Sequence, residues 1–276
     1  MQNDDLTRLD GRLALVTGAA AGIGAGIAEA LARKGARLVL VDQDAATLEV
    51  EVAAIREAGH DASGVVADVR ERDCVDALAA AVDEAGGRLE VLVNNVGDHQ
   101  PWGSFAESTE DDWTEIYRVN FEHVLRVTRL FLPRMIAQRA GSIINVSSVE
   151  AFRGVPNCAV YAAHKSAVVN FTAGLSTEVG QHGVRVNGLA PDVTDTPQFP
   201  LHTLIAPKYH DQIGRWVPMG RFGTPRDHGE IAAFLASDAA QWITGETIRV
   251  DGGTLASAGW FRRDENRFTN VPRNFI

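Results

Sequence analysis

The sequence is poor in cysteine. Only two cysteines occur among 276 residues, Cys74 and Cys158, and their separation matches neither a metal site nor a disulfide framework. This usage suits a reducing compartment. Cys158 is interpreted as buried apolar filler rather than as a nucleophile. The eight histidines are scattered without the spacing of metal ligands, so no metal site is predicted.

Long apolar runs and excess positive charge are also lacking. No apolar stretch approaches the ~20 residues that a membrane span needs. The first residues, MQNDDLTRLDGR, are polar and acidic, unlike a secretory signal. The net charge of −10, without a basic stripe, argues against a nucleic-acid surface. We therefore expect a cytoplasmic protein that binds neither membranes nor nucleic acids.

Short apolar strands alternate with helical segments along the chain. Strands are predicted at 12–17, 37–41, 63–67, 90–93, 142–146, 183–189 and 246–250, and helices at 25–34, 45–58, 70–84, 109–138, 158–180 and 230–236. Pro133 suggests a kink or an early end in the fourth helix. The alternation predicts a Rossmann-like, doubly wound α/β fold, with a seven-stranded parallel sheet and helices on both faces. Without repeats or linkers, residues 1–276 are predicted to form a single domain.

A glycine-rich turn joins the first strand to the first helix. It reads Gly18-Ala-Ala-Ala-Gly22-Ile23-Gly24. Such glycines let a pyrophosphate approach the backbone, and the helix N-terminus offers it free N–H groups. A glycine turn can also be purely structural, but its strand–turn–helix context favours a dinucleotide site.

The residue after the second strand bears on the choice of cofactor. Asp42 can accept hydrogen bonds from an adenosine ribose and would repel a 2′-phosphate. Gln43 is neutral, and residues 19–21 include no Lys or Arg. The sequence therefore predicts NAD rather than NADP. Asp42 could also cap the following helix.

Tyr161 and Lys165 are four residues apart, so they share one face of the predicted helix. A free phenol titrates near pH ~10, and a neighbouring cation favours the phenolate. Ser148 ends the preceding strand and can point into the same space, as can the other residues at strand ends, Asp42, Asp68 and Asn94. A Tyr-x-x-x-Lys pair also occurs by chance on solvated helices, so it gains meaning only beside a cofactor site.

Together these residues resemble the classical short-chain dehydrogenase/reductase family over residues 8–256. The matching motifs are Thr17-Gly18-x-x-x-Gly22-Ile23-Gly24, Asp68-Val69, Asn94-Asn95-Val96-Gly97 and Asp251-Gly252-Gly253, with Val96 in place of the usual Ala. Asn120, Ser148, Tyr161 and Lys165 fall at the family's catalytic tetrad. The spacing to Tyr161 selects Ser148 over Ser147.

The resemblance implies hydride transfer between NAD(H) and a secondary alcohol or ketone. Tyr161 would exchange the substrate proton. Lys165 would hold the nicotinamide ribose and lower the pKa of Tyr161. Ser148 would orient the substrate oxygen, and Asn120, unfavourable in mid-helix unless it has a task, would hold a water. The implied cofactor contacts are Gly18, Ala21, Gly22, Ile23, Gly24, Asp42, Asp68, Val69, Asn95, Val96, Gly97, Tyr161, Lys165, Pro191, Thr194 and Thr196. Family members commonly form homotetramers, here through helices at 109–137 and 158–180.

The substrate region departs from the family pattern, because Asp192 stands where a glycine usually follows the proline. Asp192 is either a structural substitution or a substrate contact. Predicted substrate contacts are Glu150, Asp192, Trp102 and Tyr209, with Asp98, Phe152, Phe199 and Trp216 around them, although the aromatic residues could equally be packing. No arginine is evidently placed to bind a carboxylate. This composition favours an alicyclic, terpenoid or steroid-like alcohol.

Two further segments and the competing functions complete the predictions. Residues 197–217 are predicted to form a mobile helical flap. The tail at 257–276, with Trp260, Phe261, Arg262 and Arg263, is expected to pack across a subunit interface. The alternative functions are a 3-oxoacyl thioester reductase and a non-catalytic dinucleotide-binding sensor or scaffold. A nucleotide-sugar epimerase or dehydratase is disfavoured, because its usual Gly-x-x-Gly-x-x-Gly turn is absent.

Overall fold

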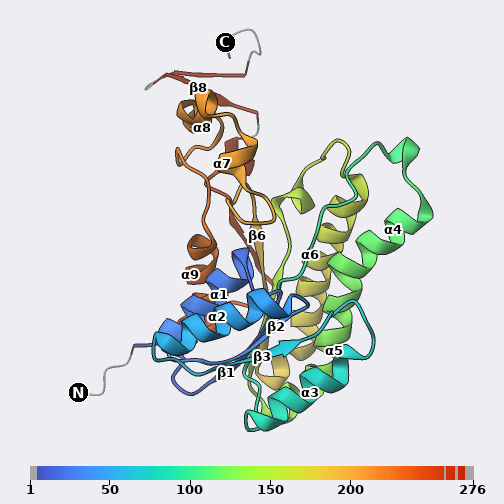
Figure 1. Ribbon diagram of the computed structural model, residues 1–276, viewed down its shortest axis with the longest axis vertical. Coiled ribbons are helices and arrows are strands. Elements are labelled where there is room, and N and C mark those ends of the chain that lie inside the picture. The colour runs from blue at the N-terminus through green and yellow to red at the C-terminus, as the bar shows by residue number, and fades with distance from the viewer. Residues whose placement is uncertain (1–4, 258, 265–266, 271–276) are drawn as a thin grey trace.

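A seven-stranded parallel sheet forms the centre of the computed structural model, which describes residues 5–257, 259–264 and 267–270 (Figure 1). The strands are β1 (Leu13–Thr17), β2 (Arg37–Asp42), β3 (Ala62–Val66), β4 (Val91–Asn94), β5 (Gly141–Val146), β6 (Val184–Pro191) and β7 (Thr247–Val250). Their order is β3-β2-β1-β4-β5-β6-β7, and each neighbouring pair is parallel. The predicted doubly wound α/β architecture is confirmed.

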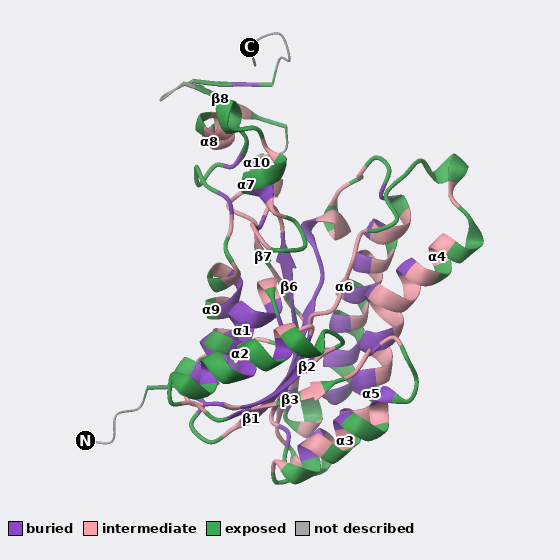
Figure 2. Ribbon diagram, viewed as in Figure 1, coloured by how far each residue is buried: buried purple, intermediate pink, exposed green. Residues whose placement is uncertain are grey.

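Helices cover both faces of the sheet, so the inner strands β1, β2, β4, β5 and β6 are largely buried (Figure 2). One face carries α1 (Gly22–Arg33), α2 (Ala45–Glu57) and α9 (Pro225–Ala236), and the other carries α3 (Cys74–Glu84), α5 (His123–Gln138) and α6 (Ala159–Val179). Along β1, Ala14 and Val16 join the first core, whereas Leu13 and Leu15 join the second. Burial on both faces explains why the inner strands are largely apolar, whereas the edge strands β3 and β7 carry exposed residues.

The closest helix packing fixes the position of α1, which begins at the glycine turn. A Cβ added at Gly26 would lie 2.4 Å from the carbonyl oxygen of Pro225. One added at Gly229 would lie 2.1 Å from the carbonyl oxygen of Gly26. The backbones of α1 and α9 therefore touch, and neither position has room for a side chain.

The predicted helix at 109–138 is divided. It consists of α4 (Glu110–Tyr117), a π-helical turn η2 (Arg118–Glu122) and α5, which passes through Pro133 to Gln138. The early end considered at Pro133 is therefore wrong. The interruption lies at Asn120, whose side-chain amide donates to the carbonyl of Ile116 (2.9 Å).

Two other helices begin at residues that differ from those predicted from the sequence. α9 begins at Pro225 instead of Glu230, because Thr224 and Asp227 form a capping box with Pro225 at the first position. α3 begins at Cys74, after a turn at Arg70. Short 3₁₀ turns, η1 (Phe105–Glu107), η3 (Val149–Phe152), η4 (Gly180–His182) and η6 (Asp238–Ala240), complete the core.

The flap and the tail lie together at one end of the molecule (Figure 1). The flap contains α7 (Leu201–Leu204), η5 (Pro207–Gln212) and α8 (Ile213–Trp216). After α10 (Thr254–Ser257), β8 (Phe261–Asp264) pairs with β9 (Arg267–Thr269) in an antiparallel hairpin that the sequence pattern did not reveal. Arg262 Nη2 donates to the carbonyl of Pro218 (3.1 Å), which ties the hairpin to the flap. Of the helices described, none has the length and apolarity to cross a bilayer.

The contact between α1 and α9 gives the first testable expectation. Gly26→Ala should destabilise the protein by about 1–3 kcal/mol, because the new methyl group must displace the backbone of Pro225. Gly174→Ala on α6 is the matched control, since a Cβ there meets nothing within 4 Å, and it should stabilise by about 0.5–1 kcal/mol. Urea unfolding measures both, and equal effects of the two variants would contradict this packing.

Candidate functional site

A cavity of about 660 Å³ opens at the carboxyl edge of the sheet. It is lined by residues that follow the six strands β1 to β6. The chain runs outward from β1 to β3 and then returns to β4 on the other side of β1, so the cavity lies at the point where the strand order reverses. Parallel α/β sheets bind their ligands at this point.

The glycine turn closes one side of the cavity. Gly18 and Gly22 have φ of +63° and +59°, a left-handed conformation that favours glycine. A Cβ at Gly24 would lie 1.9 Å from the carbonyl oxygen of Gly18. Asn95 Nδ2 donates to the carbonyls of Thr17 (3.1 Å) and Gly18 (3.0 Å), which fastens the turn to the end of β4. Gly24 lies behind the turn, whereas Gly18, Ala21, Gly22 and Ile23 line the cavity.

Asp42 lies at the far end of this cavity with its carboxylate held by backbone amides. Its Oδ2 accepts from the N–H of Ala20 and its Oδ1 from the N–H of Asp44, both at 3.1 Å. The cap of α2 is Asp44, which accepts from Ala46 and Thr47. Asp42 is therefore not the helix cap, and it remains on the cavity wall.

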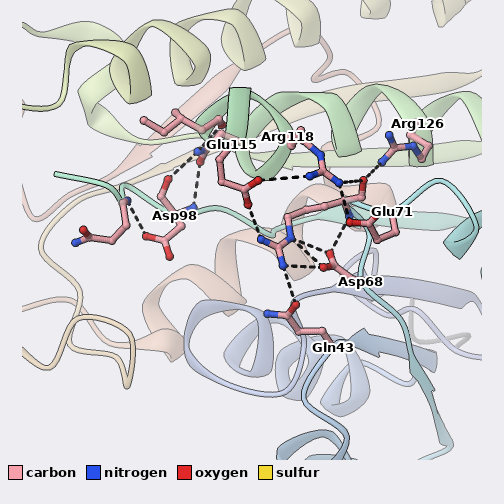
Figure 3. A network of polar contacts seen from close by, with 11 residues as sticks. Gln43, Asp68, Glu71, Asp98, Glu115, Arg118 and Arg126 are labelled. Atoms are coloured by element: carbon pink, nitrogen blue, oxygen red, sulfur yellow. Dashed lines mark hydrogen bonds and ion pairs between the residues drawn. The ribbon is translucent and has the colours of Figure 1, made fainter. Parts of the chain in front are cut away.

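An arginine that the sequence analysis missed lies beside Asp42 and Asp68. Arg70 Nη2 donates to Asp68 Oδ2 (2.7 Å) and Nη1 to Glu115 Oε1 (2.6 Å). Arg70 Nη2 also reaches Gln43 Oε1 (3.2 Å). Asp68, Glu115 and Gln43 converge from β3, α4 and β2 (Figure 3). The guanidinium of Arg70 is thus held between two carboxylates, and its hydrogen bond to Asp68 lowers the pKa of that carboxyl group.

Ser148, Tyr161 and Lys165 come together at the end of β5 and the start of α6. The hydroxyls of Ser148 and Tyr161 are hydrogen-bonded. Lys165 Nζ lies 5.7 Å from the centroid of the Tyr161 ring and donates to the carbonyl of Val146 (3.2 Å). The neighbouring Ser147 instead donates to the carbonyl of Lys165 (2.8 Å), so Ser148 rather than Ser147 is the serine next to the phenol.

Burial dominates the titration of this pair. It lowers the pKa of Lys165 from 10.5 to about 8. Burial also raises the pKa of Tyr161, although the hydrogen bond from Ser148 acts in the opposite direction. The expected lowering of the Tyr161 pKa by Lys165 is therefore not seen in the protein alone. Desolvation of the phenolate raises the pKa, and the nearby Cys158, Glu150 and Asp98 add to that effect.

Asn120 is fully buried behind the cavity wall. Its Nδ2 donates to the carbonyl of Asp98 (2.7 Å), and its Oδ1 accepts from the N–H of Asp98 (3.2 Å). A Cβ at Gly97 would lie 2.6 Å from Lys165 Nζ and 3.1 Å from Asn120 Oδ1. Asn120 therefore fixes the loop after β4, and a glycine at position 97 leaves room for the ammonium.

A second unpredicted arginine lies at the opposite end of the cavity from Asp42. Arg153 Nε and Nη2 donate to the two oxygens of Glu150 (2.9 and 2.8 Å), and Nη2 also reaches Asp192 Oδ2 (3.2 Å). An arginine thus lies in the substrate region, with Glu150 and Asp192 as its carboxylate partners, whereas the prediction that none is placed to bind a substrate carboxylate stays a prediction. Sequence could not reveal this pair, because Arg153 and Asp192 are 39 positions apart.

Most of the remaining predicted residues line the main cavity, and two lie outside it. Trp102, Asp98, Phe199, Trp216, Pro191, Thr194 and Thr196 line the main cavity with Asp68, Val69, Asn95, Val96 and Gly97. Phe152 and Tyr209 do not. Phe152 is exposed at the end of η3, and the η5 turn directs Tyr209 into a separate cavity of about 280 Å³ with Phe261 and Arg262. His99 was missed: its ring lies 5.8 Å from Phe199 and 6.5 Å from Tyr161, between centroids.

The two buried cysteines add no reactive group. Burial raises the pKa of Cys158 to about 11, so its thiol stays protonated near neutral pH, as expected of filler. Within the described ranges, no group of three or more His, Cys, Asp or Glu side chains is arranged to hold a metal ion.

Comparisons with known proteins agree with this geometry. Residues 18–254 match the family model described as enoyl-(acyl carrier protein) reductase. The 3-oxoacyl-[acyl-carrier-protein] reductase of Thermotoga maritima is 35% identical over 248 residues, which cover 90% of this chain and 99% of the relative.

Two solved structures are similarly close. A gluconate 5-dehydrogenase from Burkholderia cenocepacia, in complex with NADP and tartrate, has a TM-score of 0.84 and 34% identity, and covers 91% of this chain and 98% of its own. A 7α-hydroxysteroid dehydrogenase complexed with NADH and 7-oxo glycochenodeoxycholic acid has a TM-score of 0.84 and 32% identity, and covers 92% and 98%. The range matched by the family model, residues 18–254, contains the glycine turn and the Ser148–Tyr161–Lys165 group, and the chain belongs to the short-chain dehydrogenase/reductase family.

Proposed function

We propose that this oxidoreductase uses NAD(H) to interconvert a secondary alcohol and a ketone at Ser148 and Tyr161. The observation that carries the proposal is the buried ammonium of Lys165 beside that hydroxyl pair, in a cavity that extends to Asp42. A non-catalytic sensor would need the glycine turn but not this costly burial of a cation.

The cavity fits a nicotinamide dinucleotide. Lys165 Nζ has three N–H donors and, among the described residues, one acceptor, the carbonyl of Val146, so ribose hydroxyls would satisfy the other two donors. The pyrophosphate would lie against Gly18 and Gly22, and the adenosine ribose against Asp42. Pro191, Thr194 and Thr196 would flank the nicotinamide. When bound, the cofactor supplies the hydride chemistry.

The chain's own residues would bind and move the proton. Ser148 orients the reacting oxygen, and Tyr161 exchanges the hydroxyl proton. Lys165, together with a positively charged oxidised nicotinamide, would bring the raised pKa of Tyr161 down. Asn120 Oδ1 accepts from the N–H of Asp98 and has a second lone pair with which it would hold a water.

The preference for NAD rests on charge. Asp42 would repel a 2′-phosphate, and Arg70, the nearest described cation on the cavity wall, is already paired with Asp68 and Glu115. The relatives differ in the cofactor named with them, so the preference needs a direct test.

The reacting end of the cavity supports an alicyclic, terpenoid or steroid-like substrate, because His99, Trp102, Phe199 and Trp216 give it a largely aromatic lining. A 3-oxoacyl thioester reductase is the second candidate. A side cavity of about 290 Å³ shares Trp102 and Tyr161 with the main one and could take an acyl chain. A panel of secondary alcohols and 3-oxoacyl thioesters, followed by NADH absorbance, tests both, and no turnover of any member would contradict the proposal.

A cytoplasmic homotetramer is also proposed. The family resemblance suggests assembly through α4–α5 and α6. The hairpin leaves Trp260 and Phe268 exposed, at 52% and 61%, which favours burial of the tail between subunits.

Tyr161→Phe should lower kcat by about 10²–10⁴-fold or more, because the phenol that transfers the proton is removed. NADH affinity should stay near the wild-type value, since the ring remains. Tyr209→Phe is the control, because Tyr209 lies outside the main cavity, and it should leave kcat unchanged. Substantial turnover by Tyr161→Phe would refute the assignment.

Asp42→Ser should shift the ratio of NADPH to NADH affinity towards NADPH by about 10- to 100-fold, because about 1.4–2.7 kcal/mol of repulsion is removed. Fluorescence titration gives both dissociation constants without a substrate. Asp44→Ser keeps a capping hydroxyl on α2 and should leave the ratio unchanged. An equal change in the ratio of NADPH to NADH affinity in the two variants would contradict the role of Asp42 in cofactor choice.

Lys165→Met should stabilise the cofactor-free protein. Below pH 8 the ammonium is charged in both the folded and the unfolded chain, and its burial costs about 3 kcal/mol, at about 1.4 kcal/mol per pH unit. From pH 8 to 10.5 the folded chain binds fewer protons than the unfolded chain, so the free energy of unfolding of wild type rises with pH. The difference in unfolding free energy between Lys165→Met and wild type therefore disappears over this range. Urea unfolding at several pH values measures this, and a pH-independent difference would contradict it.

A further inference from the structure

An ion cluster forms the polar wall at the reacting end of the cavity. Glu150 comes from η3, Arg153 follows it, Asp192 follows β6, and Thr254 begins α10. The hydroxyl of Thr254 donates to Asp192 Oδ2, and Arg153 bridges Asp192 to Glu150. Four side chains from three elements are thus joined into one unit, and Glu150, Arg153 and Asp192 place it on the cavity wall that contains Ser148 and Tyr161.

The cluster holds Arg153 firmly but leaves part of it available. The guanidinium is 33% exposed, whereas the side chain of Asp192 is only 7% exposed. Nε and Nη2 are bonded to the two carboxylates, and Nη1 has no partner among the described residues. Nη1 therefore keeps two N–H donors without a described partner, on a side chain that lines the cavity. Asp192 is occupied by Thr254 and Arg153, so it acts as a positioning residue for the guanidinium.

The charge balance decides what those donors can bind. Two carboxylates surround one guanidinium, so the cluster carries an excess of one negative charge, and Asp98 lines the same end of the cavity. The other cations on the described wall are engaged elsewhere, since Lys165 lies under Tyr161 and Arg70 lies between Asp68 and Glu115. An approaching carboxylate would meet net repulsion, whereas a neutral oxygen could accept from Nη1 and a hydroxyl could donate to Glu150.

We propose that Arg153, neutralised by Glu150 and Asp192, is a specificity-determining residue that selects uncharged substrates with a second oxygen and excludes carboxylates. This assignment rests on the proposed alcohol–ketone activity and narrows its substrate class. The reacting oxygen lies at Ser148 and Tyr161, and a hydroxyl or carbonyl elsewhere on an apolar frame is held by Arg153 Nη1 and Glu150.

Glu150→Gln is the variant that tests the assignment, because glutamine keeps an acceptor for Arg153 and removes the negative charge. The measured quantity is the ratio of kcat/KM for a cyclic hydroxycarboxylate to that for its neutral carboxamide analogue. Wild type should favour the carboxamide, and Glu150→Gln should shift the ratio towards the carboxylate at least tenfold. The double variant Glu150→Gln/Arg153→Met should not show this shift towards the carboxylate, because it lacks the guanidinium of Arg153.

Glu115→Gln is the matched control. It makes the same substitution on a carboxylate paired with the other cavity arginine, and it should leave the substrate ratio unchanged. A wild-type preference for the carboxylate, or an equal ratio in wild type and Glu150→Gln, would overturn the proposal.

A binding measurement separates this inference from the proposed activity. Trp102 and Trp216 line the cavity, so their fluorescence can report the binding of benzoate and of benzamide to the protein saturated with NADH. Wild type should bind benzamide more tightly than benzoate. Glu150→Gln should lower the ratio of the benzoate to the benzamide dissociation constant at least tenfold. If no alcohol is turned over, the proposed function fails, but the ratio of the benzoate and benzamide dissociation constants still tests the role of Arg153. Equal binding of both ligands by wild type would contradict that role.

Discussion

The burial of one ammonium group, that of Lys165, constrains the site more than any other feature. In the part of the chain that the structure describes, its Nζ has a single acceptor, the carbonyl of Val146, and the space that it fills is open only because residue 97 is a glycine. The elements around it are held by a buried chain of amides and hydroxyls: Asn94 donates to Asn145 and Thr128, and Asn145 donates to Thr172. This chain joins β4, β5, α5 and α6 at the level of the site. A desolvated cation lowers stability, and a protein keeps such a group where a ligand supplies its missing partners.

Charge along the cavity follows one pattern from end to end. Five carboxylates and three cations line its described wall, and both arginines are held between two carboxylates. At the Asp42 end, this arrangement leaves no unpaired cation for a phosphate on the ribose. At the Ser148 end, it leaves a guanidinium that can donate hydrogen bonds but carries no net attraction for an anion. The aromatic side chains at the Ser148 end give the reacting region its apolar surface. The proposed preferences, for NAD and for an uncharged substrate, thus follow from the same excess of carboxylates.

Much of this arrangement could be predicted from sequence, because its signals are local. Continuous apolar strands, left-handed glycines between a strand and a helix, and a Tyr-x-x-x-Lys spacing are all contained within a few residues. The parts that could not be predicted depend on distant partners. Arg70 meets Glu115 from 45 positions away, and Arg153 meets Asp192 from 39. The π-helical turn at Asn120 has the apolar pattern of an ordinary helix, and the tail hairpin has no periodic pattern. Tyr209 was misplaced because the flap turns by short 3₁₀ segments, which set the direction of a side chain independently of the helical period.

The central claim is that the cofactor completes the proton-handling site, so that Tyr161 titrates differently with and without it. The chain has only three tyrosines, which makes this directly measurable. Ultraviolet titration of the phenolate, taken as the difference between wild type and Tyr161→Phe, isolates the signal of Tyr161. In the protein alone, the pKa of Tyr161 should lie above its ordinary value of 10.0, because burial disfavours the phenolate. With saturating NAD+, the account predicts that it falls by about 2 units or more, since a second positive charge joins Lys165. The same titration curve in both conditions would contradict the account.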